Sequence, residues 1–201
     1  TLFRSISKRF GPVQANADVN LSVAQATVHG IVGENGAGKS TLMSVLYGLC
    51  TADRGRIELD GRPVLIRHPH DAIALGLGMV HQHFLLVDTL TALDNLMLGA
   101  EPHALLQRAE SSMRPRLYNL MQSTGLKVAL DAPVAALPVG ERQRLEILKA
   151  LARGARILIL DEPTAVLTPQ ETEALFQVLE RLAAQGTTVL LITHKLREIM
   201  A

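Results

Sequence analysis

The chain has 201 residues and a formal net charge of +1, and 48% of its residues are hydrophobic. This composition is typical of one domain with a buried core and not of a disordered chain. The near-neutral charge and the 3% aromatic content supply no basic field and few stacking groups, so nucleic-acid binding is not expected.

The sequence also limits where the chain could act. No apolar run is long enough to cross a bilayer and no signal peptide opens the chain, so any membrane role would pass through a partner. The one cysteine, Cys50, excludes an internal disulfide and fits a reducing compartment. Because the chain starts at Thr1 and not at Met, we expect it to be part of a longer protein.

The first 23 residues predict two strands joined by a loop at 10–12. From spacing alone, Phe10 is more simply an edge-strand aromatic than a side chain that stacks on a nucleotide base. A buried strand is expected at 26–32. The apolar spacing then predicts a helix over 39–49, with Leu49 on its buried face.

Between this strand and this helix lies a segment that fits the phosphate-binding pattern G-x-x-x-x-G-K-[ST] without a mismatch. Its glycines let successive N–H groups turn toward one anion, and the following helix places its positive end there. Lys39 would reach the terminal phosphates of a nucleotide, and the Ser40 hydroxyl would bind Mg²⁺. A tight glycine turn alone would not explain Lys39 and Ser40. The nucleotide-binding residues expected here are Gly33, Glu34, Asn35, Gly36, Ala37, Gly38, Lys39, Ser40 and Thr41.

Two short apolar runs at 56–59 and 64–66 flank an Asp-Gly pair, which is typical of a hairpin. A short helix at 68–75 and a strand at 77–80 follow. Two pairs of alternating histidines suggest a metal site, but no cysteine or carboxylate ligand accompanies them, so we expect surface residues. These histidines are His68, His70, His81 and His83.

The middle of the chain breaks the alternation of strands and helices. Residues 89–124 and 140–152 are expected to be largely helical, with breaks at Gly99 and Pro102. We therefore expect residues 84–153 to form an inserted helical subdomain within a single domain of 201 residues.

Two further buried strands are expected at 156–161 and 188–192. The first ends in Asp161 and Glu162, and the second is followed by His194. Because ligands bind at the carboxyl ends of parallel strands, we expect these side chains beside the phosphate loop. Asp161 would hold Mg²⁺, and Glu162 would orient or deprotonate an attacking water.

The helix between these two strands carries explicit start and stop signals. Thr168, Pro169 and Glu171 supply an N-cap, a first-turn proline and a capping-box acid in the right order. Gly186 is placed to end the helix.

In the order of its motifs the chain resembles the ATP-binding cassette ATPases over nearly its whole length. Residues 33–40 resemble the Walker A motif, 157–162 resemble Walker B with its catalytic glutamate, and His194 resembles the switch histidine that senses the γ-phosphate. Gln82 lies where the family's Q-loop glutamine contacts Mg²⁺ and the attacking water, and Phe10 lies where the family has an adenine-stacking aromatic. The signature loop, which contacts the nucleotide of the opposite cassette, is matched by Leu137, Pro138, Val139, Gly140 and Glu141.

The resemblance implies an α/β P-loop NTPase with a central, mostly parallel sheet, an antiparallel β-subdomain and an inserted helical subdomain. It implies ATP hydrolysis with Mg²⁺ between two head-to-tail cassettes, peripherally at the cytoplasmic face of the membrane. The chain is most similar to the first cassette of tandem importers of simple sugars or nucleosides. Those proteins carry a second cassette on the same chain, act with a transmembrane permease and, indirectly, with a solute-binding protein.

Two positions depart from the family pattern. Pro138 replaces the usual serine of the signature loop and lacks both a hydroxyl and an N–H, so the site closed by this loop is expected to be weakened. Thr168 stands where many cassettes have the aspartate of the D-loop, which contacts the opposite cassette.

Two alternatives to a transport ATPase remain. One is a soluble cassette ATPase of DNA repair, chromosome structure or ribosomes. The other is a nucleotide-binding regulatory module without turnover, against which Lys39, Asp161, Glu162 and His194 argue.

Overall fold

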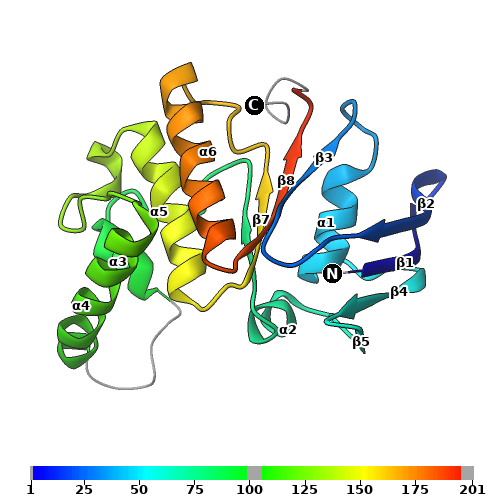
Figure 1. Ribbon diagram of the computed structural model, residues 1–201, viewed down its shortest axis with the longest axis horizontal. Helices are drawn as coiled ribbons and strands as arrows, with labels where there is room; N and C mark the ends of the chain where they lie inside the picture. The colour runs from blue at the N-terminus through cyan, green and yellow to red at the C-terminus, as the bar shows by residue number, and fades with distance from the viewer. Residues whose placement is uncertain (1, 99–105, 196–201) are drawn as a thin grey trace.

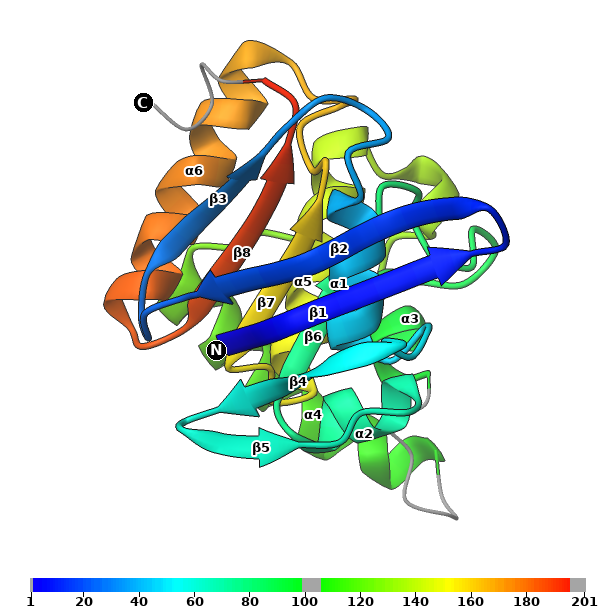
Figure 2. The same cartoon turned by 90° about the vertical axis from the view of Figure 1, so that its right-hand side faces the viewer.

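Two four-stranded sheets lie on opposite sides of one helix, α1 (Figures 1 and 2). In this computed structural model, which describes residues 2–98 and 106–195, one sheet is antiparallel with strand order β2-β1-β4-β5. The other is parallel with strand order β3-β8-β7-β6. The fold class expected from the sequence, a parallel sheet with an antiparallel β-subdomain and added helices, is confirmed. The breaks predicted at Gly99 and Pro102 lie outside the described residues.

The elements follow one another along the chain as the sequence predicts, with boundaries that differ by a few residues. The strands are β1 (Leu2–Phe10), β2 (Val13–Ser22), β3 (Val28–Val32), β4 (Arg54–Leu59), β5 (Arg62–Val64), β6 (Leu77–Val80), β7 (Ile157–Asp161) and β8 (Thr188–Thr193). The helices are α1 (Lys39–Tyr47), α2 (Pro69–Ala74), α3 (Ala92–Met97), α4 (Leu106–Thr124), the 3₁₀ turn η1 (Val134–Ala136), α5 (Val139–Ala152) and α6 (Pro169–Ala184).

The parallel sheet is buried on both faces, which explains why its strands are nearly continuous apolar runs. In β7, Leu158 and Leu160 face the side covered by α5 and α6, whereas Ile159 faces the side of α1. In β8, Leu191 faces the side of α5 and α6, and Ile192 faces the side of α1. This alternation means that the sheet separates two apolar clusters and supports a ligand site only at its edge.

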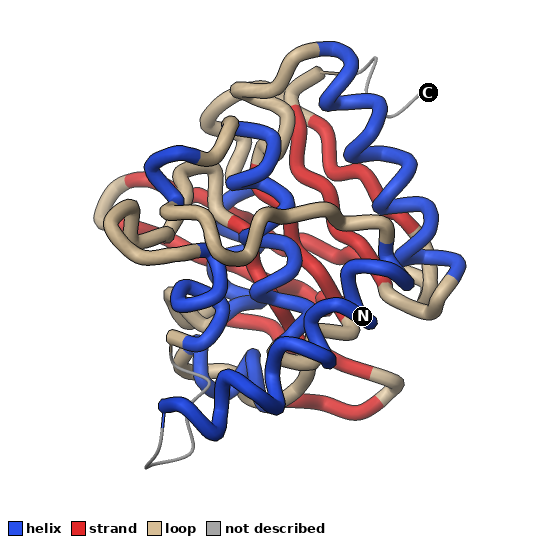
Figure 3. Tube along the Cα trace, turned by 90° about the vertical axis from the view of Figure 1, so that its left-hand side faces the viewer, coloured by secondary structure: helices blue, strands red, loops and turns tan. Residues whose placement is uncertain are grey.

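On the face opposite α1, helices α5 and α6 cover the sheet, and α3 and α4 pack outside α5 (Figures 1 and 3). Leu145 and Leu148 of α5, Leu179 of α6 and Leu117 of α4 belong to one buried cluster. Of the helices in the described part of the chain, none is both long and apolar enough to cross a membrane.

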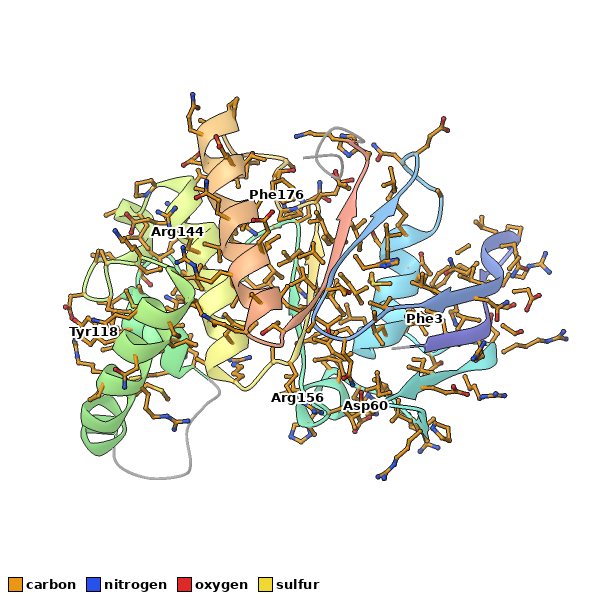
Figure 4. All side chains as sticks on the ribbon, viewed as in Figure 1. Phe3, Asp60, Tyr118, Arg144, Arg156 and Phe176 are labelled. Carbon is orange, nitrogen blue, oxygen red and sulfur yellow. The ribbon has the colours of Figure 1, made fainter. Side chains whose placement is uncertain are left out.

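The antiparallel sheet closes the other side of α1. Phe3 in β1 is 1% exposed and belongs to the apolar cluster that also contains Met43 and Leu46 of α1 (Figure 4). Strands β4 and β5 meet at Asp60 and Gly61, whose φ angles of 51° and 74° form the left-handed turn that an Asp-Gly pair favours. The predicted hairpin is confirmed.

Helix α1 is shorter than the sequence predicts. It ends at Tyr47, because Gly48 adopts a left-handed φ of 77° and its N–H bonds back to the last turn. Leu49 therefore lies outside the helix and is 50% exposed, so its prediction as a buried helical residue was wrong.

Helix α6 begins as its sequence predicts. The Thr168 side chain accepts a hydrogen bond from the Glu171 N–H, and the Glu171 carboxylate accepts one from the Thr168 N–H at 2.9 Å. The helix ends just before Gly186, which has a φ of 96°. The capping box and the glycine stop are both confirmed.

Candidate functional site

The glycine-rich loop leads from the end of β3 into the first turn of α1. Gly38 is the N-cap of α1, has a left-handed φ of 81°, and supplies no side-chain cap. A side chain at Gly38 would also collide with the carbonyl oxygen of Ala15 in β2. The first N–H groups of α1 therefore lack a side-chain acceptor, and the first turn contains no acidic residue. Such a helix end is suited to an anion.

Asn16 holds this loop from the neighbouring sheet. The side chain is 6% exposed and its Nδ2 donates to the Gly38 carbonyl oxygen at 3.1 Å. Sequence reasoning missed this residue, because a single polar side chain in an edge strand gives no signal of what it contacts.

An open cavity of about 460 Å³ lies over the loop. Its walls come from the β1–β2 hairpin, the glycine-rich loop, the segment after β6 and the turn after β7. The lining residues are Phe10, Val13, Gln14, Ala15, Asn35, Gly36, Ala37, Gly38, Lys39, Ser40, Thr41, Gln82 and Glu162. The structure thus brings most of the predicted nucleotide-binding residues to one cavity, while Gly33, Glu34 and His194 line an adjoining hollow with Asn35.

The ammonium group of Lys39 lies against the loop that contains it. Its Nζ donates to the carbonyl oxygens of Gly33 at 2.7 Å and Glu34 at 2.8 Å. These two hydrogen bonds hold a positive charge at the wall of the cavity, where it can attract an anion.

Ser40 and Asp161 meet across the site. The Ser40 Oγ donates to Asp161 Oδ1 at 3.2 Å, although the two residues are far apart in the sequence. Burial raises the pKa of Asp161 above its usual value, and the hydrogen bond from Ser40 partly opposes that shift. A hydroxyl and a carboxylate side by side are oxygen ligands of the type that Mg²⁺ prefers.

Glu162 is the centre of a second set of contacts. Its Oε1 lies 3.1 Å from His194 Nδ1, and its Oε2 accepts from Gln82 Nε2 at 3.4 Å. The backbone of Glu162 has a left-handed φ of 47°, and its N–H donates to the Ile192 carbonyl oxygen at 3.0 Å. The expected convergence of these residues is observed, but the strained backbone was not predictable from the sequence.

Phe10 ends β1 at the mouth of the cavity. Its ring is 49% exposed, and Lys8 Nζ lies 5.2 Å from the ring centroid. An exposed aromatic face on the wall of a cavity can stack on a flat ligand, so this position fits the stacking interpretation as well as that of an edge-strand residue.

The residues of the predicted signature loop do not line this cavity. Leu137 is buried, and Pro138 is the N-cap of α5 without a side-chain cap. Val139 is 41% exposed, Gly140 is buried, and Glu141 Oε2 accepts from the Ala129 N–H at 3.3 Å. These residues thus start a second helix at a separate place from the loop at α1.

The histidines differ in their surroundings. His68, His70 and His83 are exposed, as expected, whereas His81 is half-buried with its ring edge-on to Tyr47, 6.3 Å between centroids. His81 directly follows β6, which brings it beside the end of α1, so it is less exposed than the other three histidines. Within residues 2–98 and 106–195, no three His, Cys, Asp or Glu side chains group as metal ligands.

Comparison with known families decides what this arrangement is. The family model described as "ABC transporter" matches residues 17–165. The chain belongs to the ABC transporter family. The matched region contains the glycine-rich loop, Gln82, the start of α5, and both Asp161 and Glu162.

Curated relatives of this ABC protein are longer than the chain itself. It is 46% identical to the nucleoside import ATP-binding protein NupA of Lactococcus lactis, over 98% of this chain and 39% of that protein. It is 46% identical to the ribose import ATP-binding protein RbsA of Hahella chejuensis, over 96% of this chain and 39% of the relative. The chain thus spans well under half of the length of these relatives.

Solved structures agree with the fold. A nucleotide-free ATP-binding cassette from an ABC transporter superposes with a TM-score of 0.87 and 26% identity, over 99% of this chain and 83% of that one. The ADP conformation of an ATP-binding cassette superposes with the same TM-score of 0.87 and 27% identity, over 99% and 82% of the two chains. The fold is that of the ABC ATPases.

Proposed function

We propose that this chain is a nucleotide-binding cassette that binds ATP with Mg²⁺ and hydrolyses it to power import of a small polar solute. The observation that carries the proposal is the convergence, at the carboxyl ends of neighbouring parallel strands, of an uncapped helix start, the Ser40–Asp161 contact and the Glu162–His194 contact. No single local feature would imply a nucleotide, but a phosphate site beside a carboxylate pair does.

The chain's own groups would bind the nucleotide as follows. The N–H groups at the start of α1 would accept the phosphates, since they have no side-chain acceptor. Lys39 would exchange its two carbonyl partners for phosphate oxygens. The exposed ring of Phe10 would stack on the base at the mouth of the cavity. Binding would therefore draw on both the β1–β2 hairpin and the loop.

The donor set fits Mg²⁺. Ser40 and Asp161 present oxygen atoms 3.2 Å apart, and Gln82 adds a side-chain amide from the segment after β6. We propose that these three residues hold the ion, which when bound would neutralise charge on the phosphates. The charge of the ion would then offset much of the free-energy cost of burying an ionised Asp161.

Glu162 is the proposed general base. Its carboxylate lines the cavity, and its two oxygens are oriented by His194 and Gln82. It would take a proton from a water that attacks the terminal phosphate, and His194 would stabilise the charge that develops there. Gln82 would hold the same carboxylate in place while contacting that water.

We propose that hydrolysis needs a second cassette. In this proposal the signature residues 137–141 close over a nucleotide held by the opposite cassette, and residues 84–153 form the helical subdomain that carries them. Their position at α5, apart from the cavity, supports this division. The second cassette would lie on the same full-length protein, whose greater length in the relatives leaves room for it.

We propose that a permease binds at a hollow between the α1–α2 region and helix α5. This hollow of about 250 Å³ separates the end of α1 and helix α2 from α5. Leu49 and Leu85 line it and are 50% and 63% exposed, so they offer apolar surface to a partner. Because Leu85 follows Gln82 closely, a permease segment seated there would sense the nucleotide site.

The names of the relatives support import of a sugar or nucleoside. We further propose that a solute-binding protein acts indirectly and that the cassette lies at the cytoplasmic face of the membrane. The two relatives above are nucleoside and ribose import proteins, and a glucose import ATP-binding protein of Haloferax volcanii is 42% identical over 98% of this chain. In this proposal the cassette supplies energy for transport and does not itself contact the solute.

The test uses the intact protein, expressed with its partner permease. We expect magnesium-dependent phosphate release and ATP-dependent uptake of ribose or a nucleoside into vesicles. Phosphate release without an associated permease would favour a soluble cassette ATPase. ATP binding without release would favour a regulatory module, and the absence of ATP binding would overturn the proposal altogether.

A further inference from the structure

Helix α5 starts without a cap from its own sequence. Its N-cap is Pro138, which has no side-chain donor or acceptor, and the structure gives it no side-chain cap hydrogen bond. The first N–H groups of a helix need partners, and those near buried Gly140 have little access to water. Another part of the chain can therefore supply an acceptor for this helix start.

That acceptor is the carboxylate of Glu171 in the first turn of α6. A Cβ built on Gly140 would lie 2.5 Å from Glu171 Oε1, so the carboxylate lies directly against the backbone of Gly140. The other oxygen, Oε2, accepts from the N–H and the Oγ1 of Thr168, each at 2.9 Å. The carboxylate thus lies at two helix starts, with Oε2 bonded to Thr168 and Oε1 beside Gly140.

The charge of Glu171 fits this double role. Hydrogen bonds from the backbone and side chain of Thr168 lower its pKa most, with smaller contributions from Arg144 and the backbone N–H of Gly140. Arg144 lies on α5, on the side that faces α6 (Figure 4). An ionised carboxylate at the positive ends of two helices is favourable at both.

The turn that leads to Glu171 begins at Glu162. The Ala165 N–H donates to the Glu162 carbonyl oxygen at 3.2 Å, and the Leu167 N–H donates to the Thr164 carbonyl oxygen at 3.3 Å. Thr164 is 2% exposed. A short, hydrogen-bonded and partly buried turn therefore joins the proposed general base to the N-cap Thr168.

We propose that Glu171 is a positioning residue that ties the start of α5 to the turn after Glu162. A shift of α5 would be transmitted through the carboxylate to Thr168 and along the turn to the catalytic side chain. The inference rests on the proposed function, because that function makes Glu162, at the start of the turn, a catalytic residue whose position matters. A side chain at position 140 would displace the Glu171 carboxylate from this position.

The deciding variant is Glu171→Gln. A glutamine can still complete the capping box of α6, so the protein is expected to fold. It has one acceptor oxygen in place of two, so it cannot cap α6 and accept from Gly140 together. The matched control is Glu173→Gln, because Glu173 is exposed on the same helix and loses the same charge.

Hydrogen exchange of the intact protein measures the contact without any need for activity. We expect Glu171→Gln to speed exchange of the Gly140 amide by roughly 2- to 30-fold relative to Glu173→Gln, with the amides of α6 unchanged. Equal exchange at Gly140 in the two variants would show that the carboxylate does not hold α5, and would overturn the inference.

The second measurement is the split between turnover and binding. We expect Glu171→Gln to lower kcat by roughly 2- to 30-fold while ATP affinity stays within about twofold of the control. Faster exchange with unchanged kcat would overturn the tie to Glu162. A wild-type protein that releases no phosphate would instead refute the proposed function, while leaving the exchange result to decide whether Glu171 holds Gly140.

Discussion

Helices α1 and α6 both follow strands of the parallel sheet, but they start in opposite ways. At α6, Thr168 and Glu171 form a complete capping box, and Pro169 fills the first position. At α1, Gly38 provides no side-chain cap and the first turn contains no acid. At a capped helix start, side chains of the chain itself accept hydrogen bonds from the first N–H groups. At an uncapped start, those N–H groups are left for water or a ligand.

The surroundings of the two helix starts extend this difference. The start of α1, which includes Lys39 and Ser40, lines an open cavity, and the Ser40 hydroxyl donates to Asp161. The start of α6 faces the start of α5, which its own Glu171 covers. The comparison teaches that one end is built to receive a ligand with negative charge, and the other to hold two parts of the molecule together.

The largest expected effect concerns the acid beside the α1 site. If Glu162 is the general base, Glu162→Gln should lower ATP turnover of the intact protein by roughly 10²–10⁴ while ATP binding persists, because the start of α1 is untouched. Phosphate release and equilibrium nucleotide binding measure the two effects. Glu180→Gln, an exposed acid on α6, is the control and should change neither. Near-wild-type hydrolysis in Glu162→Gln would remove Glu162 from this role.

A second prediction tests the uncapped start of α1 with two glycines. Gly38→Ala should lose about 1–2 kcal/mol of unfolding free energy through left-handed strain, and a further ~1–3 kcal/mol through collision with Ala15. Gly36→Ala has a similar φ of 84° but no atom within 4 Å, so only the strain applies. Denaturant unfolding of both variants measures the difference. Equal losses would contradict a tight fit of Gly38 against β2.

The third prediction tests the capped start of α6. Thr168→Ala removes the side-chain acceptor for the Glu171 N–H and should cost about 1 kcal/mol of unfolding free energy. Thr172→Ala makes the same chemical change one turn further along, where no cap is lost, and should fall within ~0.5 kcal/mol of wild type. Thermal unfolding compares the two. If both variants lost the same stability, the capping box would contribute nothing measurable.

The sequence predicted these two helix starts because their signals are local. The glycine-rich loop and the capping box each lie within a few consecutive residues, so spacing alone identifies them. The prediction for Leu49 failed although Gly48, a local stop signal, precedes it. That miss came from following apolar spacing past a glycine.

The supporting contacts between distant residues could not be predicted from the sequence. Asn16 reaches Gly38 from another sheet. The contact of Glu171 with Gly140 likewise depends on how α5 and α6 pack. In each pair, the residue type was readable but its partner depended on the tertiary fold. The sequence therefore identified most members of the candidate site and few of its supports.

The smallest expected effect is a pH-dependent one with opposite signs at two aspartates. Burial raises the folded-state pKa of Asp161 above its unfolded value of 3.8, so its contribution to stability is full below that pH and is lost as the pH rises through the folded pKa. The hydrogen bond from Arg114 lowers the pKa of Asp131, so its contribution is present above 3.8 and is lost as the pH falls through the folded pKa.

At neutral pH, Asp161→Asn should therefore raise the free energy of unfolding slightly, and Asp131→Asn should lower it slightly. Both differences should shrink in acid, where the wild-type carboxylates are protonated. Denaturant unfolding without Mg²⁺, at neutral and at acidic pH, measures them. A loss of stability in Asp161→Asn at neutral pH would mean that the hydrogen bond from Ser40 outweighs the cost of burial. The expected gain in stability would instead mean that the Asp161 carboxylate, beside the uncapped start of α1, is a destabilising charge. A site that is built to bind a cation keeps such a charge.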